Sequence, residues 1–200
     1  AGDALTTGGS NVAVGKDSLS AETGGAANVA VGKGTLATQN ANTTSYNTAV
    51  GHETGGAITT GVNNVLIGAL AGDALTDADF NVAMGYQALT TDTLGSQSTA
   101  IGHHALQTQN FSTATNSGNT ALGFQAGKTV STGTSNTLIG GKAGTSITNG
   151  NNNTILGQGA GDAMQTGSSN TFIGVNCAGS GNVSGTSNTA MGNSAGNDLT

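Results

Sequence analysis

Charged side chains are scarce in this sequence. Asp, Glu, Lys and Arg make up 7% of the 200 residues, where about 25% is usual in globular proteins. Four residues are cationic, ten are acidic, and the formal net charge is −6. Because nucleic-acid binding requires clustered cations that neutralise phosphates, we expect no nucleic-acid partner. No apolar run approaches the roughly 20 residues of a transmembrane helix, so we also expect no membrane insertion.

Proline and tryptophan are absent, aromatic residues make up 3%, and Cys177 is the one cysteine. A single cysteine cannot form an internal disulfide. A large core built on Leu and Phe is also excluded, because much of the apolar fraction is Ala. Disordered chains usually carry high net charge or much proline, and this sequence has neither. We therefore expect an ordered chain whose core is narrower than that of a globular domain.

The residues that carry catalysis are scarce as well. Glu occurs only at Glu22 and Glu53, no carboxylate pair suits glycosidase chemistry, and no Ser–His–Asp arrangement stands out. His52 and His103 are too far apart for a shared metal, although three copies of His103 could meet at a trimer axis. The acidic stretch 73–79 is a weak calcium candidate, because it lacks the Gly and Glu of an EF-hand loop. We predict no enzymatic activity, no catalytic residue, no cofactor and no metal site, with the histidines as solvated turn residues.

What the sequence does contain is one pentapeptide, repeated throughout. It reads Asn, then Val or Thr, then a small or apolar residue, then an aliphatic residue, then Gly. Eleven copies follow one another at spacings of mostly 17 residues, with 19, 21 and 18 at three places. The copies end at Gly15, Gly32, Gly51, Gly68, Gly85, Gly102, Gly123, Gly140, Gly157, Gly174 and Gly192.

A period of 17 residues is too short for a helical hairpin repeat, which needs about 33. It suits one solenoid coil of two short strands and two turns, with Val, Thr and Ile in the strands and Gly, Asn, Ser and Asp in the turns. The prediction is an all-β fold: a parallel β-solenoid of about twelve 17-residue coils. Residues 1–200 should form a single repeat domain. Both ends lie inside a coil without a polar cap, which indicates a fragment of a longer fibrous chain.

The residues after each glycine show a size compensation. Where the fourth residue is Leu, as at Leu106, the seventh is polar, as at Gln109; where the fourth is Gly, as at Gly127, the seventh is aliphatic, as at Val130. We infer one core pocket per coil, filled from either side of a turn. Cys177 occupies the small third position, so we interpret it as a buried thiol rather than a reactive one.

Alternation along each strand predicts two faces. The aliphatic residue before Gly and the Val/Thr position share one face, which we expect to line the interior. The residue between them should point outward, yet that column is apolar too. An exposed apolar ladder marks an interface. It is a candidate oligomer interface, carried by Leu66, Leu138, Ile155 and Phe172.

Two further features stand out. The Asn of the pentapeptide recurs in ten of the eleven copies, with Ser98 the exception, and should stack amide on amide from coil to coil. The two long coils carry insertions within 39–46 and 107–118. Insertions in a solenoid map to loops on one face, often the binding face. Tyr46, Asn110 and Phe111 are therefore candidate receptor contacts, with a tolerated loop extension as the alternative.

The segments 85–89 (GYQAL) and 98–102 (STAIG) resemble a 17-residue repeat common in phage tail fibre proteins. The pentapeptides NVAVG and NTAVG are similar to the head repeats of trimeric autotransporter adhesins, although the period here is longer. The resemblance covers essentially the whole chain. It implies a left-handed solenoid, a homotrimer, and a place in a virion tail fibre or on an extracellular surface.

These observations favour a structural shaft or receptor-binding segment of a phage tail fibre, with a host-surface glycan or another surface receptor as partner. The first alternative is a bacterial surface adhesin head. An ice-binding solenoid is a weaker one, because its Thr column lacks a second paired Thr column. A depolymerising tailspike enzyme is disfavoured by short coils and few carboxylates. The Thr column is Thr120, Thr137, Thr154, Thr171 and Thr189.

Overall fold

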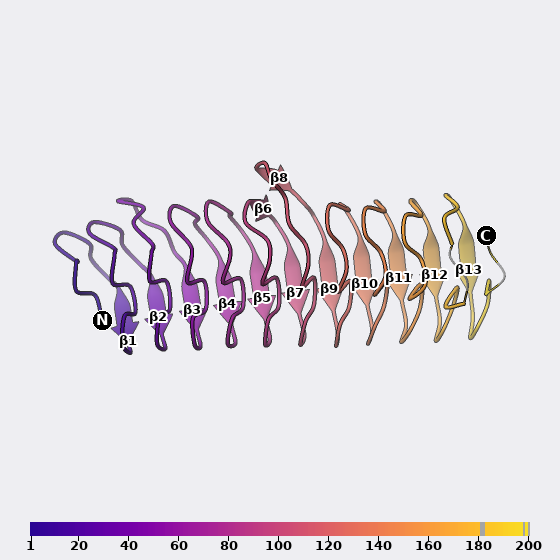
Figure 1. Cartoon of the computed structure of the whole chain (residues 1–200), viewed down its shortest axis with the longest axis horizontal. Coiled ribbons are helices and arrows are strands. Elements are labelled where there is room, and N and C mark those ends of the chain that lie inside the picture. Colours follow the sequence, from indigo (N-terminus) through magenta and orange to yellow (C-terminus); the bar gives the residue numbers. More distant parts are fainter. Residues whose placement is uncertain (181–182, 198, 200) are drawn as a thin grey trace.

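The computed structural model describes residues 1–180, 183–197 and 199. The chain winds into a row of similar coils, with the two ends of the chain at opposite ends of the row (Figure 1). Each pentapeptide contributes one three-residue strand, and eleven strands form one parallel sheet in sequence order. The strands are β1 (Val12–Val14), β2 (Val29–Val31), β3 (Thr48–Val50), β4 (Val65–Ile67), β5 (Val82–Met84), β7 (Thr99–Ile101), β9 (Thr120–Leu122), β10 (Thr137–Ile139), β11 (Thr154–Leu156), β12 (Thr171–Ile173) and β13 (Thr189–Met191).

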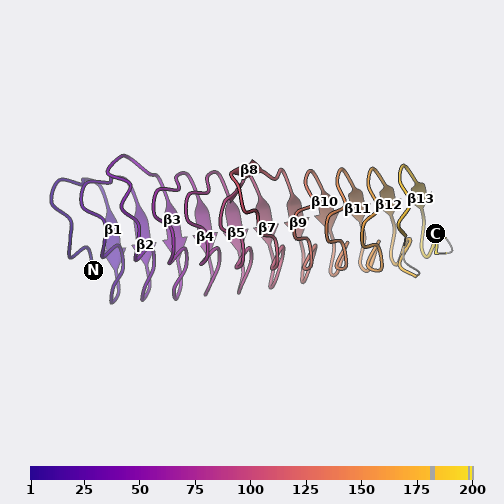
Figure 2. The same ribbon diagram turned by 45° about the horizontal axis from the view of Figure 1, so that its top comes forward.

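Equivalent repeat positions pair in register along the whole ladder; Leu138, for example, pairs with Ala121 on one side and Ile155 on the other. The predicted parallel β-solenoid is therefore confirmed. Eleven strands enclose ten complete coils, close to the expected number. The 45° turned view keeps all these strands in one row (Figure 2).

The glycine after each strand is required by a close approach between coils. At Gly140 the backbone has φ 129°, and a Cβ atom there would lie 2.5 Å from the carbonyl oxygen of Gly157. No side chain fits at that distance, and L-residues rarely adopt that φ. The recurrence of this glycine thus follows from coil-to-coil contact.

The orientation predicted for the strands is wrong. The middle residue of each strand points into the coil: nine of the eleven have no exposed surface, among them Leu66, Leu138, Ile155 and Phe172. The residues on either side of it face solvent. The physical reason is that the interior of the coil is narrow. A large middle residue fits there only if the residue packed beside it is Gly or Ala, and a small middle residue leaves room for a large neighbour. The four proposed interface residues are core residues of a single chain.

The predicted core pocket is confirmed. In the coils with Leu at the fourth position this Leu fills the pocket, as Leu106 does. In the coils with Gly there, the aliphatic seventh residue fills it, as Val130 does. Neither side chain has exposed surface. A Cβ atom at Gly127 would lie 2.6 Å from Leu138 Cδ1 and 3.3 Å from Val130 Cγ2. The large side chain on either side of the turn therefore occupies the same space.

This packing makes a prediction for Gly144, whose Cβ would lie 2.8 Å from Ile147 Cδ1 and 2.9 Å from Leu138 Cδ2. Gly144→Leu should destabilise the chain by about 1–3 kcal/mol through overpacking. The backbone tolerates Leu there, because Leu89 occupies the equivalent position with φ 54°. Adding Ile147→Ala should recover part of the loss, with a coupling of about 0.5–3 kcal/mol in urea unfolding. Strictly additive effects would contradict the shared pocket.

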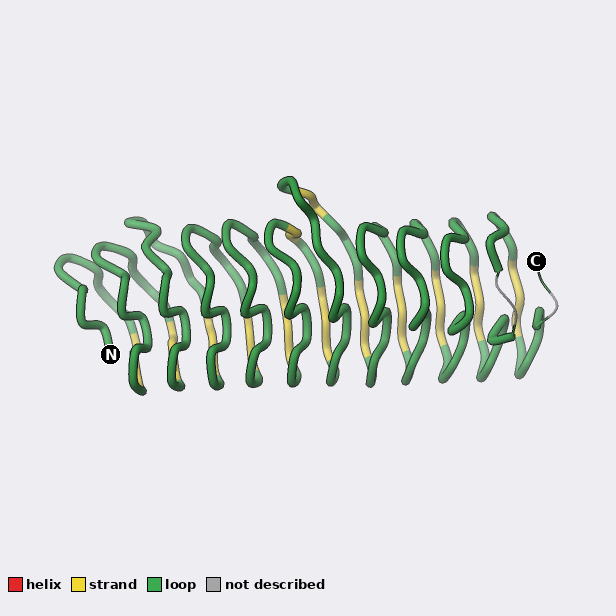
Figure 3. Tube along the Cα trace, viewed as in Figure 1, coloured by secondary structure: helices red, strands yellow, loops and turns green. Residues whose placement is uncertain are grey.

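The second strand expected in each coil is mostly absent from the described residues. Figure 3 shows strand on one side of each coil and turns on the other. One short pair, β6 (Gly95–Ser96) and β8 (Thr115–Asn116), forms a separate two-stranded sheet. Elsewhere the coil turns through residues with positive φ, such as Lys142 at 62° and Gln125 at 56°. Backbone bonds between coils still hold these turns, for example Lys142 N to Phe124 O at 2.8 Å.

The asparagine ladder is confirmed. Asn64 Nδ2 donates to the Ala78 carbonyl at 2.8 Å and to Asn47 Oδ1 at 3.2 Å, and Asn64 Oδ1 accepts the backbone N–H of Asn81 at 2.9 Å. The Asn64 amide thus closes its own coil and bonds to both neighbouring coils, whereas Asn28 Nδ2, in the coil with the shorter insertion, has no partner. At the exception, Ser98 Oγ instead lies 2.6 Å from Ser117 Oγ, which comes from the longer insertion. The ladder is a structural element of the fold.

Candidate functional site

One side of the eleven-stranded sheet faces away from the core. It consists of three columns: the first and third residue of each strand, and the residue two positions before each strand. We call these columns the outer sheet face. Several of its aliphatic and aromatic residues are strongly exposed, including Val14 at 55%, Phe80 at 55% and Leu122 at 44%.

No charged residue occurs in any of these columns. Each strand contributes three positions, and all are apolar, Tyr, Thr, Ser, Asn, Gln or Gly. Ten ladder steps and about four residues of width give the face a projected area of roughly 600 Å². Depletion of charge is the compositional mark of an interface core.

The outer sheet face changes chemistry along the rod. Towards the N-terminus the first strand residue is mostly Val, as in Val12, Val29, Val65 and Val82. From β7 onward this residue is always Thr, beside an aliphatic third residue. The resulting Thr column on the solvent side is Thr99, Thr120, Thr137, Thr154, Thr171 and Thr189.

An aromatic ladder borders the outer sheet face on one side. Tyr86, His103 and Phe124 directly follow the glycines of three successive coils. The ring centroids of Tyr86 and His103 are 5.4 Å apart, and those of His103 and Phe124 5.5 Å apart, both pairs stacked. Tyr86 is 46% and Phe124 50% exposed. Three stacked rings at a solvated corner form a platform for ring-shaped ligands.

His104 supports this ladder from behind. Its ring centroid lies 3.8 Å from that of His103, and its Nε2 is 2.9 Å from Gln87 Oε1. Gln107 Nε2 donates to the same oxygen at 3.2 Å. Burial of the ring, together with the neighbouring His103 and Lys128, lowers the pKa of His104. The imidazole therefore favours its neutral form, which avoids repulsion from these groups.

Sequence reasoning predicted His103 as a solvated turn residue and singled out neither Tyr86 nor Phe124. His103 is exposed, as expected. The signal that could have revealed the ladder is the column itself, because consecutive repeats place an aromatic or imidazole ring directly after the glycine. His52 occupies the same column two coils before Tyr86 and is not part of the stack.

The insertions lie at one edge of the rod, where β8 rises above the neighbouring coils (Figure 1). Tyr46 is 60% exposed and Asn110 is exposed. Tyr46 lies two positions before β3 and so belongs to the outer sheet face, whereas Asn110 lies outside it. Phe111 is only 6% exposed. It is an anchor that tethers the longer insertion to the core, and its predicted role as a receptor contact is therefore wrong.

Buried carboxylates hold both inserted loops. Asp92 Oδ1 accepts the backbone N–H of Phe111 at 3.2 Å, and Asp92 Oδ2 accepts Gln109 Nε2 at 2.6 Å. Glu22 Oε2 accepts the backbone N–H of Ala41 in the other loop at 3.3 Å. In each case the acid lies one coil before the insertion. In both coils Leu fills the core pocket, at Leu19 and Leu89, and a fully buried acid occupies the seventh position after the glycine.

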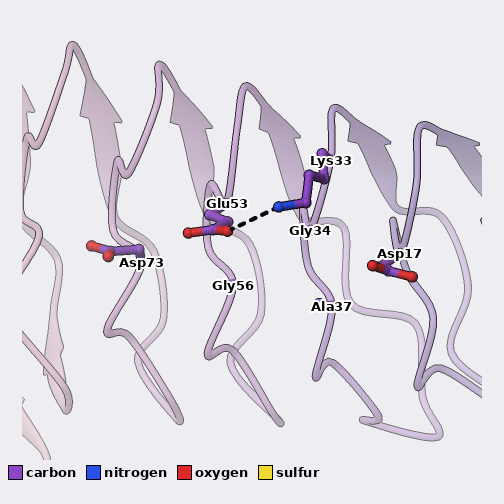
Figure 4. Close-up of a pocket in the computed structure, with 7 residues that line it drawn as sticks. All are labelled: Asp17, Lys33, Gly34, Ala37, Glu53, Gly56 and Asp73. Atoms are coloured by element: carbon purple, nitrogen blue, oxygen red, sulfur yellow. Dashed lines mark ion pairs between the residues drawn. The ribbon is translucent and has the colours of Figure 1, made fainter.

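A shallow groove of about 390 Å³ crosses four coils near the N-terminus. Lys33 Nζ lies 3.6 Å from Glu53 Oε1. Asp17 and Asp73 lie at the two ends of the same row, Asp17 beyond Lys33 and Asp73 beyond Glu53 (Figure 4). Partial burial raises the pKa of Asp73, against the opposing effect of a short hydrogen bond from Thr90 Oγ1. Among the described residues no three His, Cys, Asp or Glu side chains lie where they could share a metal ion.

Cys177 is fully buried, as predicted, and burial raises the pKa of its thiol. This favours the unreactive protonated form. Within the described part of the chain, no helix has the length and apolarity needed to cross a membrane.

Comparison with known proteins yields no relative. No protein-family model matches the chain, and no similar sequence was found among curated proteins or similar fold among solved structures.

Proposed function

We propose that this chain is a non-enzymatic segment of a surface fibre, a structural shaft or receptor-binding segment of a phage tail fibre. Identical rods pack along the outer sheet face, three to a fibre by the resemblance of the repeat. The observation that carries this proposal is the charge-free outer sheet face, which runs through all eleven strands. A rod in isolation would leave this face in water, whereas packing against a copy would bury it.

Geometry supports a copy of the chain as the partner. Each coil presents the same alternation, so the face is regular at the ladder step over its whole length. Only a partner with the same repeat matches that step at every coil. The projected area is also comparable to the roughly 800 Å² that each partner contributes to a standard interface.

The test is the association state of variants that place a charge on the outer sheet face. Leu122→Glu with Leu156→Glu should dissociate the assembly, because both side chains are 44% exposed in the single chain and a charge in an interface core is costly. Sedimentation equilibrium measures the result. Thr132→Glu is the matched control, since Thr132 is exposed but lies on the turn side, and should leave assembly unchanged.

The unfolding free energy of the double variant should change little relative to the wild-type chain at a concentration where both are monomeric, by about 0.5 kcal/mol per substitution, since surface positions tolerate such changes. A wild-type chain that sediments as a folded monomer at all accessible concentrations would refute packing of rods. A trimer of the double variant as stable as that of the wild type would refute the role of this face.

The bacterial adhesin head remains the alternative with the same architecture. The longer sequence separates the two: a chaperone or tail-attachment domain in the full chain would indicate a phage fibre, and a signal peptide with a membrane anchor an adhesin.

One observation favours a second function, an ice-binding solenoid. The six consecutive Thr residues from β7 to β13 stand on the uncharged, solvent-facing side of the sheet, one in each coil. Their neighbours in the adjacent column are aliphatic rather than Thr. Thermal hysteresis of the wild-type chain, lost on Thr137→Lys, would support ice binding; freezing indistinguishable from a buffer control would exclude it.

A further inference from the structure

The aromatic ladder ends abruptly at Gly141. This residue occupies the same column as Tyr86, His103 and Phe124, one coil after Phe124. A Cβ atom built on Gly141 would meet nothing within 4 Å. One ring face of Phe124 is covered by His103, and the side towards Gly141 has no ring in the column. The column therefore contains a gap one coil wide, with an aromatic ring as one wall.

The gap has the dimensions of a single ring. Backbone hydrogen bonds keep the coils in step here, from Lys142 N to Phe124 O at 2.8 Å and from Gly159 N to Gly141 O at 2.9 Å. The next side chain in the column, Gln158, is two ladder steps from Phe124, roughly 9.6 Å. A ring in van der Waals contact with Phe124, at roughly 3.5–4 Å, would fit between them.

Polar side chains adjoin the gap. Gln158 forms its far wall and is exposed, Lys142 directly follows Gly141 and is exposed, and Gln125 directly follows Phe124. Nearby, Asp162 interacts electrostatically with Lys142, and its Oδ1 is buried without a hydrogen-bond partner. Amide, ammonium and carboxylate groups thus belong to the same and the adjoining coils as the aromatic face.

We propose that the face of Phe124 above Gly141 binds one sugar ring of a surface glycan. A pyranose offers a C–H face to the electron-rich aromatic face and hydroxyl groups at its edge to the amides and the ammonium group. The net charge of −6 disfavours a nucleobase on a phosphate chain. This inference rests on the receptor-binding part of the proposed function, and it specifies the class of ligand and the residues.

The site lies beside the outer sheet face, not on it. Its column contains Lys16, Lys33, His52 and Gln158, whereas the outer sheet face carries no charge. Polar and charged residues are typical of the rim of an interface. The platform would therefore stay open to solvent when rods pack along the outer sheet face.

The test titrates chitotetraose, maltotetraose and cellotetraose separately into the full chain and follows the Phe124 ring resonances and the backbone amide resonance of Gly141 by NMR; the amide reports on variants that lack the ring. We expect at least one tetrasaccharide to shift them with a Kd of about 1 mM. Phe124→Ala should weaken binding roughly tenfold or more. Gly141→Phe should weaken it to a similar degree, because the new ring would stack on Phe124 and fill the gap.

Gly141→Phe keeps the test independent of folding, since the added side chain starts in open space and its φ lies outside the left-handed region. Gly9→Phe is the matched control, because a Cβ there also meets nothing within 4 Å. It should bind like the wild type. Unchanged affinity in both Phe124→Ala and Gly141→Phe would overturn the proposal, and so would the absence of any shift at Phe124 with all three sugars.

Sedimentation of the same samples separates this inference from the proposed packing of rods. A monomer that binds a tetrasaccharide at Phe124 would retain the sugar site and refute the fibre assembly. An assembly whose Phe124 resonances respond to no sugar would support the packing of rods and refute the sugar site. A response to N-acetyltyrosine amide instead of the sugars would assign the gap to an aromatic side chain of a protein and overturn the glycan.

Discussion

Leu138→Ala should lower the free energy of unfolding by about 2–5 kcal/mol, the usual cost of removing a large buried aliphatic side chain. Leu138 has no exposed surface, and its two Cδ atoms fill the space beside Gly127 and Gly144. Gly127 and Gly144 have no side chains that could move into the cavity left by the substitution. The cavity should therefore stay largely open, which places the cost in the upper part of that range. Urea unfolding of the variant measures it.

Leu156→Ala is the control, since Leu156 belongs to the adjacent strand and is 44% exposed on the outer sheet face. Its unfolding free energy should fall by well under half as much. The association state should respond in the opposite sense, changed by Leu156→Ala and unchanged by Leu138→Ala. If Leu138→Ala unfolded normally but dissociated the assembly, the middle column would face outward after all.

The two faces of the strand show where sequence reasoning reached its limit. Period, ladder register and glycine positions all followed from the pentapeptide, because each is imposed by the stacking of identical coils. Which of the two faces points into the core did not follow from the pentapeptide, because both sides of the strand are apolar. Alternation then separates two faces without saying which is inside.

A size correlation in the sequence contains the missing information. Wherever the middle strand residue is large, as in Leu66, Leu138 and Phe172, the residue six positions later is Gly or Ala, namely Gly72, Gly144 and Ala178. Two positions that are never both large share one space. This pairing ties the middle residue to the pocket that was recognised as core, and so places it inside.

The candidate site, too, was predicted from the sequence only in part. The insertions were found from the spacing of the glycines, but the orientation of their side chains was not. Phe111 is buried, and its backbone N–H donates to Asp92, one coil earlier. That contact joins residues 19 apart, and it becomes visible only when the coils are stacked. The aromatic ladder likewise exists only in the stacking direction, since no two of its rings adjoin in sequence apart from His103 and His104.

Asn136→Ala should destabilise the chain by about 3–5 kcal/mol, because a buried amide has partners in three coils and each unsatisfied buried group costs roughly 1–3 kcal/mol. Asn136 Nδ2 donates to the Gly150 carbonyl at 2.8 Å, and Asn136 Oδ1 accepts the backbone N–H of Asn153 at 3.1 Å. Alanine leaves both without a partner. Urea unfolding measures the loss.

Hydrogen exchange of the same variant locates the damage. In a solenoid each coil contacts only its neighbours, so the loss should be local. The Asn153 amide should lose protection first, while amides several coils away keep theirs. Asn149→Ala, at an exposed position with the same amide, should change the unfolding free energy by about 0.5 kcal/mol or less. Equal effects of the two substitutions would mean that the buried amides contribute no more than surface ones. Coil-to-coil cohesion would then rest on the aliphatic core alone.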